Sequence, residues 1–216
     1  MDWFRSLNNY CERIDPGYWS EPVNALTNAA FVIAAIWAWR LATRAGDVGA
    51  QALALILGVI GIGSYLFHTH AQVWSLLADV VPIQLFILAY IYLATARFFG
   101  LGAWGGLLAV VVFVPYASFT ARGIGALVGD LNGSISYVPV PILIAGYAAA
   151  RWRRRPETAR GLAIGAGILA VSIAFRSLDQ EVCEGFPLGT HFMWHILNAV
   201  MLGWMIRVMV RDPEGS

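Results

Sequence analysis

The chain has 216 residues, of which 59% are hydrophobic and 12% are charged, and its mean hydropathy is +0.66. A soluble domain carries about twice that share of charged residues, so the composition excludes an ordinary soluble protein and indicates a membrane protein. The net charge is +1 and all fourteen basic residues are arginines, so no general basic field points to nucleic acid as a partner.

The first 21 residues are polar and aromatic, and we expect them to form an extracytoplasmic segment. They lack the basic end and apolar run of a cleavable secretory signal, so the first span is expected to direct insertion.

Seven apolar windows bounded by glycine, proline and charged residues follow this segment. The fifth and sixth are short, but flanking arginines can snorkel and extend the effective span. The windows cover residues 24–41, 50–67, 75–96, 101–119, 138–152, 162–175 and 190–210. They predict an all-α membrane protein: a seven-transmembrane helix bundle in a single domain, with the bundle at 22–210 and a cytoplasmic tail at 211–216.

The arginines predict the orientation of this bundle. With seven spans, ten of them fall on the side that holds the C-terminus and four on the other side, and the cluster RWRRRPETAR lies in one short loop. Because short cytoplasmic loops are enriched in basic residues, we expect the N-terminus outside and the C-terminus in the cytoplasm.

Polar residues converge at the outer ends of three predicted helices. Ser64 and His68 are four residues apart at the end of the second helix, and Asp79 lies near the start of the third at the same depth. His191 and His195, also four apart, open the seventh helix. Residues at this spacing share one helix face, so three histidines from two helices can surround one point. His70 projects away from His68, and we expect it in a loop or at the surface.

Three imidazoles with one open position are typical of a catalytic zinc, which binds water and lowers its pKa to about 7. Ionisable groups inside a bilayer are costly and usually functional, which favours this interpretation. The alternative is a network of buried histidines that holds no metal.

The chain has Ser-x3-His, then ten residues and an aspartate, and near its C-terminus His-x3-His. This set resembles the alkaline ceramidase family, one of a group of seven-helix membrane hydrolases that includes the adiponectin-receptor-like proteins. The stretch YCERIDPGYWSEPVNALTN is similar to the family's opening in its Cys-Glu, its later Glu and its Asn-x3-Asn. These landmarks extend from residue 10 to residue 199.

The resemblance implies an intramembrane zinc and hydrolysis of the ceramide amide to a long-chain base and a fatty acid. It implies that His68, His191 and His195 are zinc ligands and that Asp79 and Ser64 are the polar groups nearest the metal. The chemistry agrees, because Asp79 could serve as general base and then general acid, and Ser64 could donate to the oxyanion. The alternatives are that Ser64 bonds back to its own helix and that Asp79 is only a favourable charge at a helix N-terminus.

Two further features depend on the same resemblance. Family members with a calcium site use an N-terminal acidic run with Asp-Trp, where this chain has Asn9 and Tyr10; the carboxylates available for calcium are those of Glu12, Asp15 and Glu21, and solvated loop carboxylates are the alternative. The family also has cysteines where this chain has Cys11 and Cys183. Both lie on the expected outer side, where an oxidising compartment permits a disulfide.

The leading hypothesis is therefore a zinc-dependent amide hydrolase acting on a ceramide-like membrane lipid. We expect it in a bacterial inner membrane with its site toward the periplasm, or in the ER or Golgi membrane if the source is eukaryotic. The alternatives are hydrolysis of another N-acyl lipid or of a phospholipid ester, and a non-enzymatic seven-helix lipid sensor with a structural zinc. Nearby, Arg176 and Asp179 are expected to pair with each other rather than with a lipid headgroup.

Overall fold

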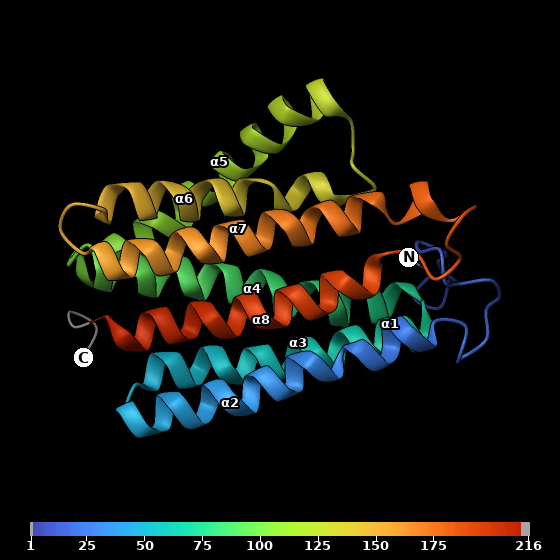
Figure 1. Cartoon of the computed structure of the whole chain (residues 1–216), viewed down its shortest axis with the longest axis horizontal. Helices are drawn as coiled ribbons and strands as arrows, with labels where there is room; N and C mark the ends of the chain where they lie inside the picture. The colour runs from blue at the N-terminus through green and yellow to red at the C-terminus, as the bar shows by residue number, and fades with distance from the viewer. Residues whose placement is uncertain (1, 213–216) are drawn as a thin grey trace.

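A computed structural model describes residues 2–212, and in these residues the regular structure is helical (Figure 1). The α-helices are α1 (Pro22–Thr27), α2 (Ala29–Ala45), α3 (Val48–His70), α4 (Val73–Phe98), α5 (Gly102–Val128), α6 (Pro139–Arg151), α7 (Pro156–Leu178) and α8 (His191–Arg211). Two 3₁₀ turns, η1 (Ser134–Tyr137) and η2 (Gln180–Val182), lie in the connections. The all-α prediction is confirmed, whereas most of the expected tail, from residue 213 onward, lies outside the described residues.

Six helical segments are long and apolar enough to cross a membrane, which indicates an integral membrane protein. In this count α1 and α2 form one segment, Pro22–Ala45. The fifth predicted window does form a helix, α6, but its 13 residues rise only about 20 Å, less than the roughly 30 Å of a hydrocarbon core. The count of seven spans and the orientation therefore stay predictions.

The long helices lie side by side, and the later part of α5 leans away from the others (Figure 1). Helix α3 packs between α2 and α4, and α8 packs between α2 and α7. Residues 2–20 lie over one end of the bundle, where α3 ends and α4 and α8 begin. The N–H of Leu7 donates to Ala71 O (2.7 Å) and the N–H of Trp74 to Trp3 O (3.1 Å). We refer to this end as the capped end.

A glycine sets the distance between α3 and α4 at the level of the site. A Cβ atom at Gly63 would overlap the backbone carbonyl of Ala78, so only glycine permits this approach. Ser64 and Asp79 are the next residues on the two helices, and the close crossing therefore brings them to the same place.

The opposite end of α3 is fixed by Asp47. Its side chain accepts a hydrogen bond from Ala50 N (2.9 Å) and caps α3, and both of its oxygens accept from Arg97 of α4 (2.6 and 2.9 Å). Burial raises the pKa of Asp47, but the hydrogen bonds and charge of Arg97 and the backbone bonds outweigh it, so the pKa lies below its ordinary value.

We expect the Asp47→Ala variant to melt about 2–4 °C below the wild type at neutral pH, because loss of a cap costs about 1 kcal/mol. A carboxyl group with a depressed folded-state pKa stabilises above its unfolded pKa of about 3.9, and this stabilisation is lost as the pH falls through the folded value. The difference in melting temperature should therefore shrink below about pH 4. Asp47→Asn, which keeps a capping side chain without the charge, is the matched control; a difference that did not change with pH would contradict the carboxylate's role.

Candidate metal centre

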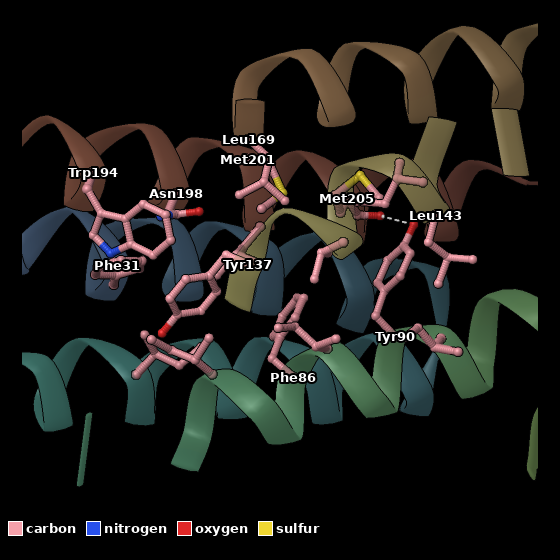
Figure 2. A pocket seen from close by; sticks show the side chains of 17 residues that line it. Phe31, Phe86, Tyr90, Tyr137, Leu143, Leu169, Trp194, Asn198, Met201 and Met205 are labelled. Atoms are coloured by element: carbon pink, nitrogen blue, oxygen red, sulfur yellow. Dashed lines mark hydrogen bonds between the residues drawn. The ribbon is translucent and has the colours of Figure 1, made fainter. Parts of the chain in front are cut away.

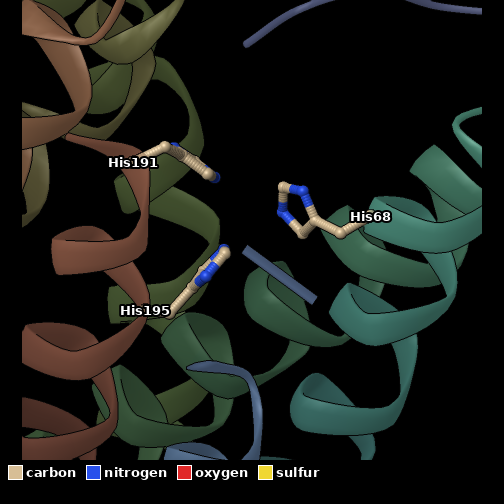
Figure 3. Close-up of side chains that lie close together, drawn as sticks. All are labelled: His68, His191 and His195. Atoms are coloured by element: carbon tan, nitrogen blue, oxygen red, sulfur yellow. The ribbon is translucent and has the colours of Figure 1, made fainter. Parts of the chain in front are cut away.

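Three histidine side chains meet at the capped end (Figure 3). His68 comes from the last turn of α3, and His191 and His195 from the first two turns of α8. Each ring offers one nitrogen, and the three nitrogens lie within 4.8 Å of one another. All three side chains are at least 99% buried. Among residues 2–212 this is the one group of three or more His, Cys, Asp or Glu side chains that converges closely enough to hold a metal ion.

Each ring has a buried nitrogen without a hydrogen-bond partner: Nε2 of His68, Nδ1 of His191 and Nε2 of His195. Buried polar atoms in proteins are nearly always paired, because an unpaired one costs about 1–3 kcal/mol. A cation bound between the rings would give the Nε2 atoms of His68 and His195 the partner that they lack. The imidazole set therefore fits a metal of zinc's ligand preference.

Contacts behind two of the rings determine their tautomers. His68 Nδ1 lies 2.6 Å from a carboxylate oxygen of Glu21, which can only accept, so this nitrogen donates and Nε2 carries the lone pair. Thr27 Oγ1 is within reach of the carbonyls of Val23 and Asn24, to which it donates, so it accepts from His195 Nδ1 at 2.9 Å. A partner on the other ring nitrogen is typical of histidines that ligate metals.

Ser64 and Asp79 lie beside the trio. Ser64 is 97% buried, and one oxygen of Asp79 is buried without a partner. The Asp79 carboxylate is close enough to interact electrostatically with His68, Ser64 and Arg176. In the part of the chain that the structure describes, no hydrogen bond joins Ser64 to its own helix backbone, and Asp79 lies beyond the first turn of α4, so neither alternative reading of these residues gains support.

Residues 2–20, which we call the capping segment, cover the site at the capped end. The ring of Tyr10 stacks on His191 with 3.6 Å between ring centres, and Tyr10 is 94% buried. Cys11 and Cys183 are joined as a disulfide with their Cα atoms 5.3 Å apart. The N–H of Cys11 also donates to Asp179 (3.0 Å), whose other oxygen accepts from the N–H groups of Thr190 and His191. Asp179 thus holds both the segment and the start of α8 in place.

Comparison with known families agrees with this arrangement. A family model described as Ceramidase matches residues 5–211. The chain belongs to the ceramidase family. Membership implies a hydrolase with a lipid substrate, and it confirms the resemblance inferred from the histidine, serine and aspartate spacing. No curated protein is similar enough in sequence to count as a match.

The acidic residues considered for calcium have other partners in this member of the ceramidase family. Glu12 accepts hydrogen bonds from the N–H groups of Val23 and Asn24 (2.7 and 2.8 Å). Burial raises the pKa of Glu12 above its ordinary value, and these hydrogen bonds offset the rise only in part. Asp15 accepts from Gly17 N (2.6 Å) in an exposed turn. Calcium binding by Glu12, Asp15 and Glu21 stays a prediction.

Glu21 instead links the capping segment to the histidines. One oxygen accepts from Arg13 Nε (2.5 Å) and the other from His68, while Arg13 also donates to His68 O (3.1 Å). Burial raises the pKa of Glu21, but the hydrogen bonds and charges of His68 and Arg13 outweigh it, so the pKa is lowered and the carboxylate is ionised at neutral pH.

We expect Glu21→Gln to weaken zinc binding by about 10–100-fold, the usual cost of losing such a partner, because the amide no longer fixes the tautomer of His68 with a charge. Competition with a calibrated chelator measures the affinity. Asp15→Asn, which changes an exposed carboxylate of the same segment, is the control. Equal zinc affinities for the two variants would exclude a positioning role for Glu21.

The expected ion pair between Arg176 and Asp179 is wrong. Asp179 lies at the end of α7, where its oxygens turn toward backbone N–H groups of Cys11 and α8. Arg176 instead donates to Asn132 O (2.9 Å) and Ser134 Oγ (2.8 Å). The chain leaves the regular helix between the two residues, so they face different neighbours.

Beneath the histidines lies an apolar cavity of about 70 Å³ between α3, α4, α6, α7 and α8 (Figure 2). Phe31, whose ring contacts that of His195, and Trp194, the residue before His195, form the part of its wall nearest the trio. Phe86, Tyr90, Leu143 and Met205 line its deeper part. The lining holds no charged side chain, so the cavity suits a hydrocarbon chain.

Proposed function

We propose that the chain is an intramembrane zinc-dependent amide hydrolase that cleaves ceramide-like N-acyl lipids into a long-chain base and a fatty acid. The observation that carries the proposal is the convergence of three buried imidazole side chains in a chain of the ceramidase family. Ser64, Asp79 and the apolar cavity support it, because they lie beside the same point.

In this proposal His68, His191 and His195 hold the zinc ion, with Glu21 and Thr27 fixing two of the rings. Bound zinc would supply Lewis acidity and a water molecule of lowered pKa. Asp79 accepts a proton from the attacking water and returns it to the nitrogen of the leaving amine. Ser64 donates a hydrogen bond to the carbonyl oxygen as that oxygen gains negative charge. The cavity binds a lipid chain and excludes water.

The capped end would face the extracytoplasmic side. Ten of the fourteen arginines are expected at the opposite end, as in cytoplasmic loops, and the disulfide is suited to an oxidising compartment. A bacterial inner membrane with the site toward the periplasm fits both features, and the ER or Golgi lumen is the equivalent in a eukaryote.

A structural zinc in a non-enzymatic lipid sensor is the second candidate. A structural site is normally closed by four protein ligands. In residues 2–212 no fourth His, Cys, Asp or Glu joins the three histidines, which favours an open position and therefore an enzyme.

Metal content and lipid hydrolysis, measured on one detergent-purified preparation made without chelator, test the proposal. Elemental mass spectrometry should find about one zinc per chain, and ceramides should release fatty acid. One zinc with cleavage of a different N-acyl lipid or a phospholipid ester would change the substrate. One zinc with no cleavage of any lipid would favour the sensor, and absence of zinc would overturn the metal site itself.

A further inference from the structure

One side chain in the apolar cavity does not match its surroundings. Asn198 is 94% buried, and its amide nitrogen has no hydrogen-bond partner. The other described residues that line the cavity are aliphatic, aromatic or methionine; two of them are tyrosines, Tyr137 and Tyr90, and the hydroxyl of Tyr90 donates to Met205 O (3.2 Å). Figure 2 shows the Asn198 amide among these side chains, in the part of the cavity shared with Trp194 and Phe31.

An amide in this position is costly for the protein by itself. Leucine has a similar volume and would complete the apolar wall, whereas a buried amide without a partner loses its bonds to water and gains nothing in return. A ligand that places one polar group beside Asn198 would restore a hydrogen bond to the amide. The Asn198 amide therefore indicates a ligand that is apolar along most of its length and polar at one position.

The position of Asn198 along α8 determines where that polar group must lie. Asn198 follows His195 by three residues, which places it about 4.5 Å further along the helix and on a neighbouring face. Because the three histidines mark the reacting end of the site, a group that contacts Asn198 lies only a few bonds from the reacting carbonyl.

The Asn198 side-chain amide and the apolar cavity wall together limit the kind of ligand group that can bind here. An asparagine side chain both donates and accepts hydrogen bonds, which matches a hydroxyl group. A carboxylate, ammonium or phosphate would be buried here without a counter-charge, because the cavity lining holds no charged residue.

We propose that Asn198 recognises a hydroxyl group that the lipid carries within about three bonds of the scissile amide, and so selects hydroxylated N-acyl lipids. This inference rests on the proposed function for the identity of the scissile bond. Hydroxyls at two kinds of position meet the condition: one on the acyl carbon next to the carbonyl, and those on the carbons of the long-chain base that are second from the nitrogen.

Four synthetic amides of equal chain length, with the acyl hydroxyl present or absent and the base hydroxyls both present or both absent, distinguish these sources. For the zinc-loaded wild type we expect kcat/KM to be about tenfold higher with the hydroxyl at one of these two kinds of position than without it, the usual effect of one satisfied hydrogen bond. Asn198→Leu should lose this preference while it still cleaves the non-hydroxylated amide. Met201→Leu, which changes an apolar residue of the same wall, is the matched control and should keep it.

Binding of the same four amides, followed by Trp fluorescence of the zinc-loaded protein, separates this inference from the proposed function. If the wild type cleaves none of them but binds a hydroxylated amide about tenfold more tightly, and Asn198→Leu does not, the hydrolase proposal fails and the hydroxyl site stands. Equal binding and turnover of all four amides by the wild type, or a preference that survives in Asn198→Leu, would overturn the inference. Asn198→Ala is the second variant if the leucine variant does not fold, and the same loss is expected of it.

Discussion

The His195→Ala variant is expected to contain no bound zinc and to hydrolyse ceramide at least about a thousandfold more slowly than the wild type. In the wild type, one imidazole nitrogen of His195 faces the two other rings, and Thr27 holds the His195 ring in place. Two remaining ligands would not retain the ion, and loss of Lewis-acid stabilisation of several kcal/mol corresponds to a rate effect of this size. Zinc per chain and initial rate, measured on the same preparation, check the expectation.

His70→Ala provides a control of the same residue type from the same helix. His70 is the last residue of α3, and its ring contacts those of Tyr18 and Trp74 instead of the trio. This variant should keep both zinc and activity. If it lost zinc as completely as His195→Ala, the loss would reflect general damage to the capped end, and the assignment of the three ligands would need revision.

The part of the site that the sequence predicted depends on helical spacing. Ser64 and His68, and His191 and His195, stand four residues apart, and helix geometry alone puts each pair on one face. The equal depth of the two pairs followed from the order of the apolar windows. These two local regularities were sufficient to bring three histidines to one point, because α3 ends and α8 begins at the capped end.

The residues that hold the histidines in place were not predictable in the same way. Glu21 and Thr27 lie 47 and 168 residues from the rings that they contact, so no spacing in the sequence links them. Glu21 was considered as a calcium ligand because of the family resemblance, with a solvated loop carboxylate as the alternative. Its burial arises only when the segment folds back over α3.

Helix lengths show a similar limit. The apolar windows located the long helices and the short α6, but the window at 162–175 underestimated α7, which runs from Pro156 to Leu178, and no window showed that the first apolar segment is broken at Asn28. The break has a consequence for the site, because the short helix α1 carries both Asn24 and Thr27 toward the histidines. A continuous helix from residue 22 would point these side chains along a different line.

The Asp79→Asn variant is expected to retain about one zinc per chain and to lose turnover by about 10²–10⁴-fold, the usual contribution of a general acid and base. Asparagine preserves the shape of the side chain between Ser64, His68 and Arg176 but cannot accept and return a proton. Ser64→Ala is the informative companion: it removes one donor to the carbonyl oxygen and should cost about 10²–10³-fold, again with zinc retained.

The pair of measurements separates three roles for Asp79. Loss of turnover with zinc in place assigns it to proton transfer. Loss of zinc and turnover together would make it a fourth ligand, which would close the metal shell and favour the structural-zinc alternative. Full zinc and full activity would leave the proton transfer to water or to another group, and the buried, partnerless oxygen of Asp79 would then need a different explanation. Since the close approach at Gly63 sets Asp79 beside Ser64 irrespective of zinc, the three outcomes follow from chemistry at one fixed position and not from a shift of α4.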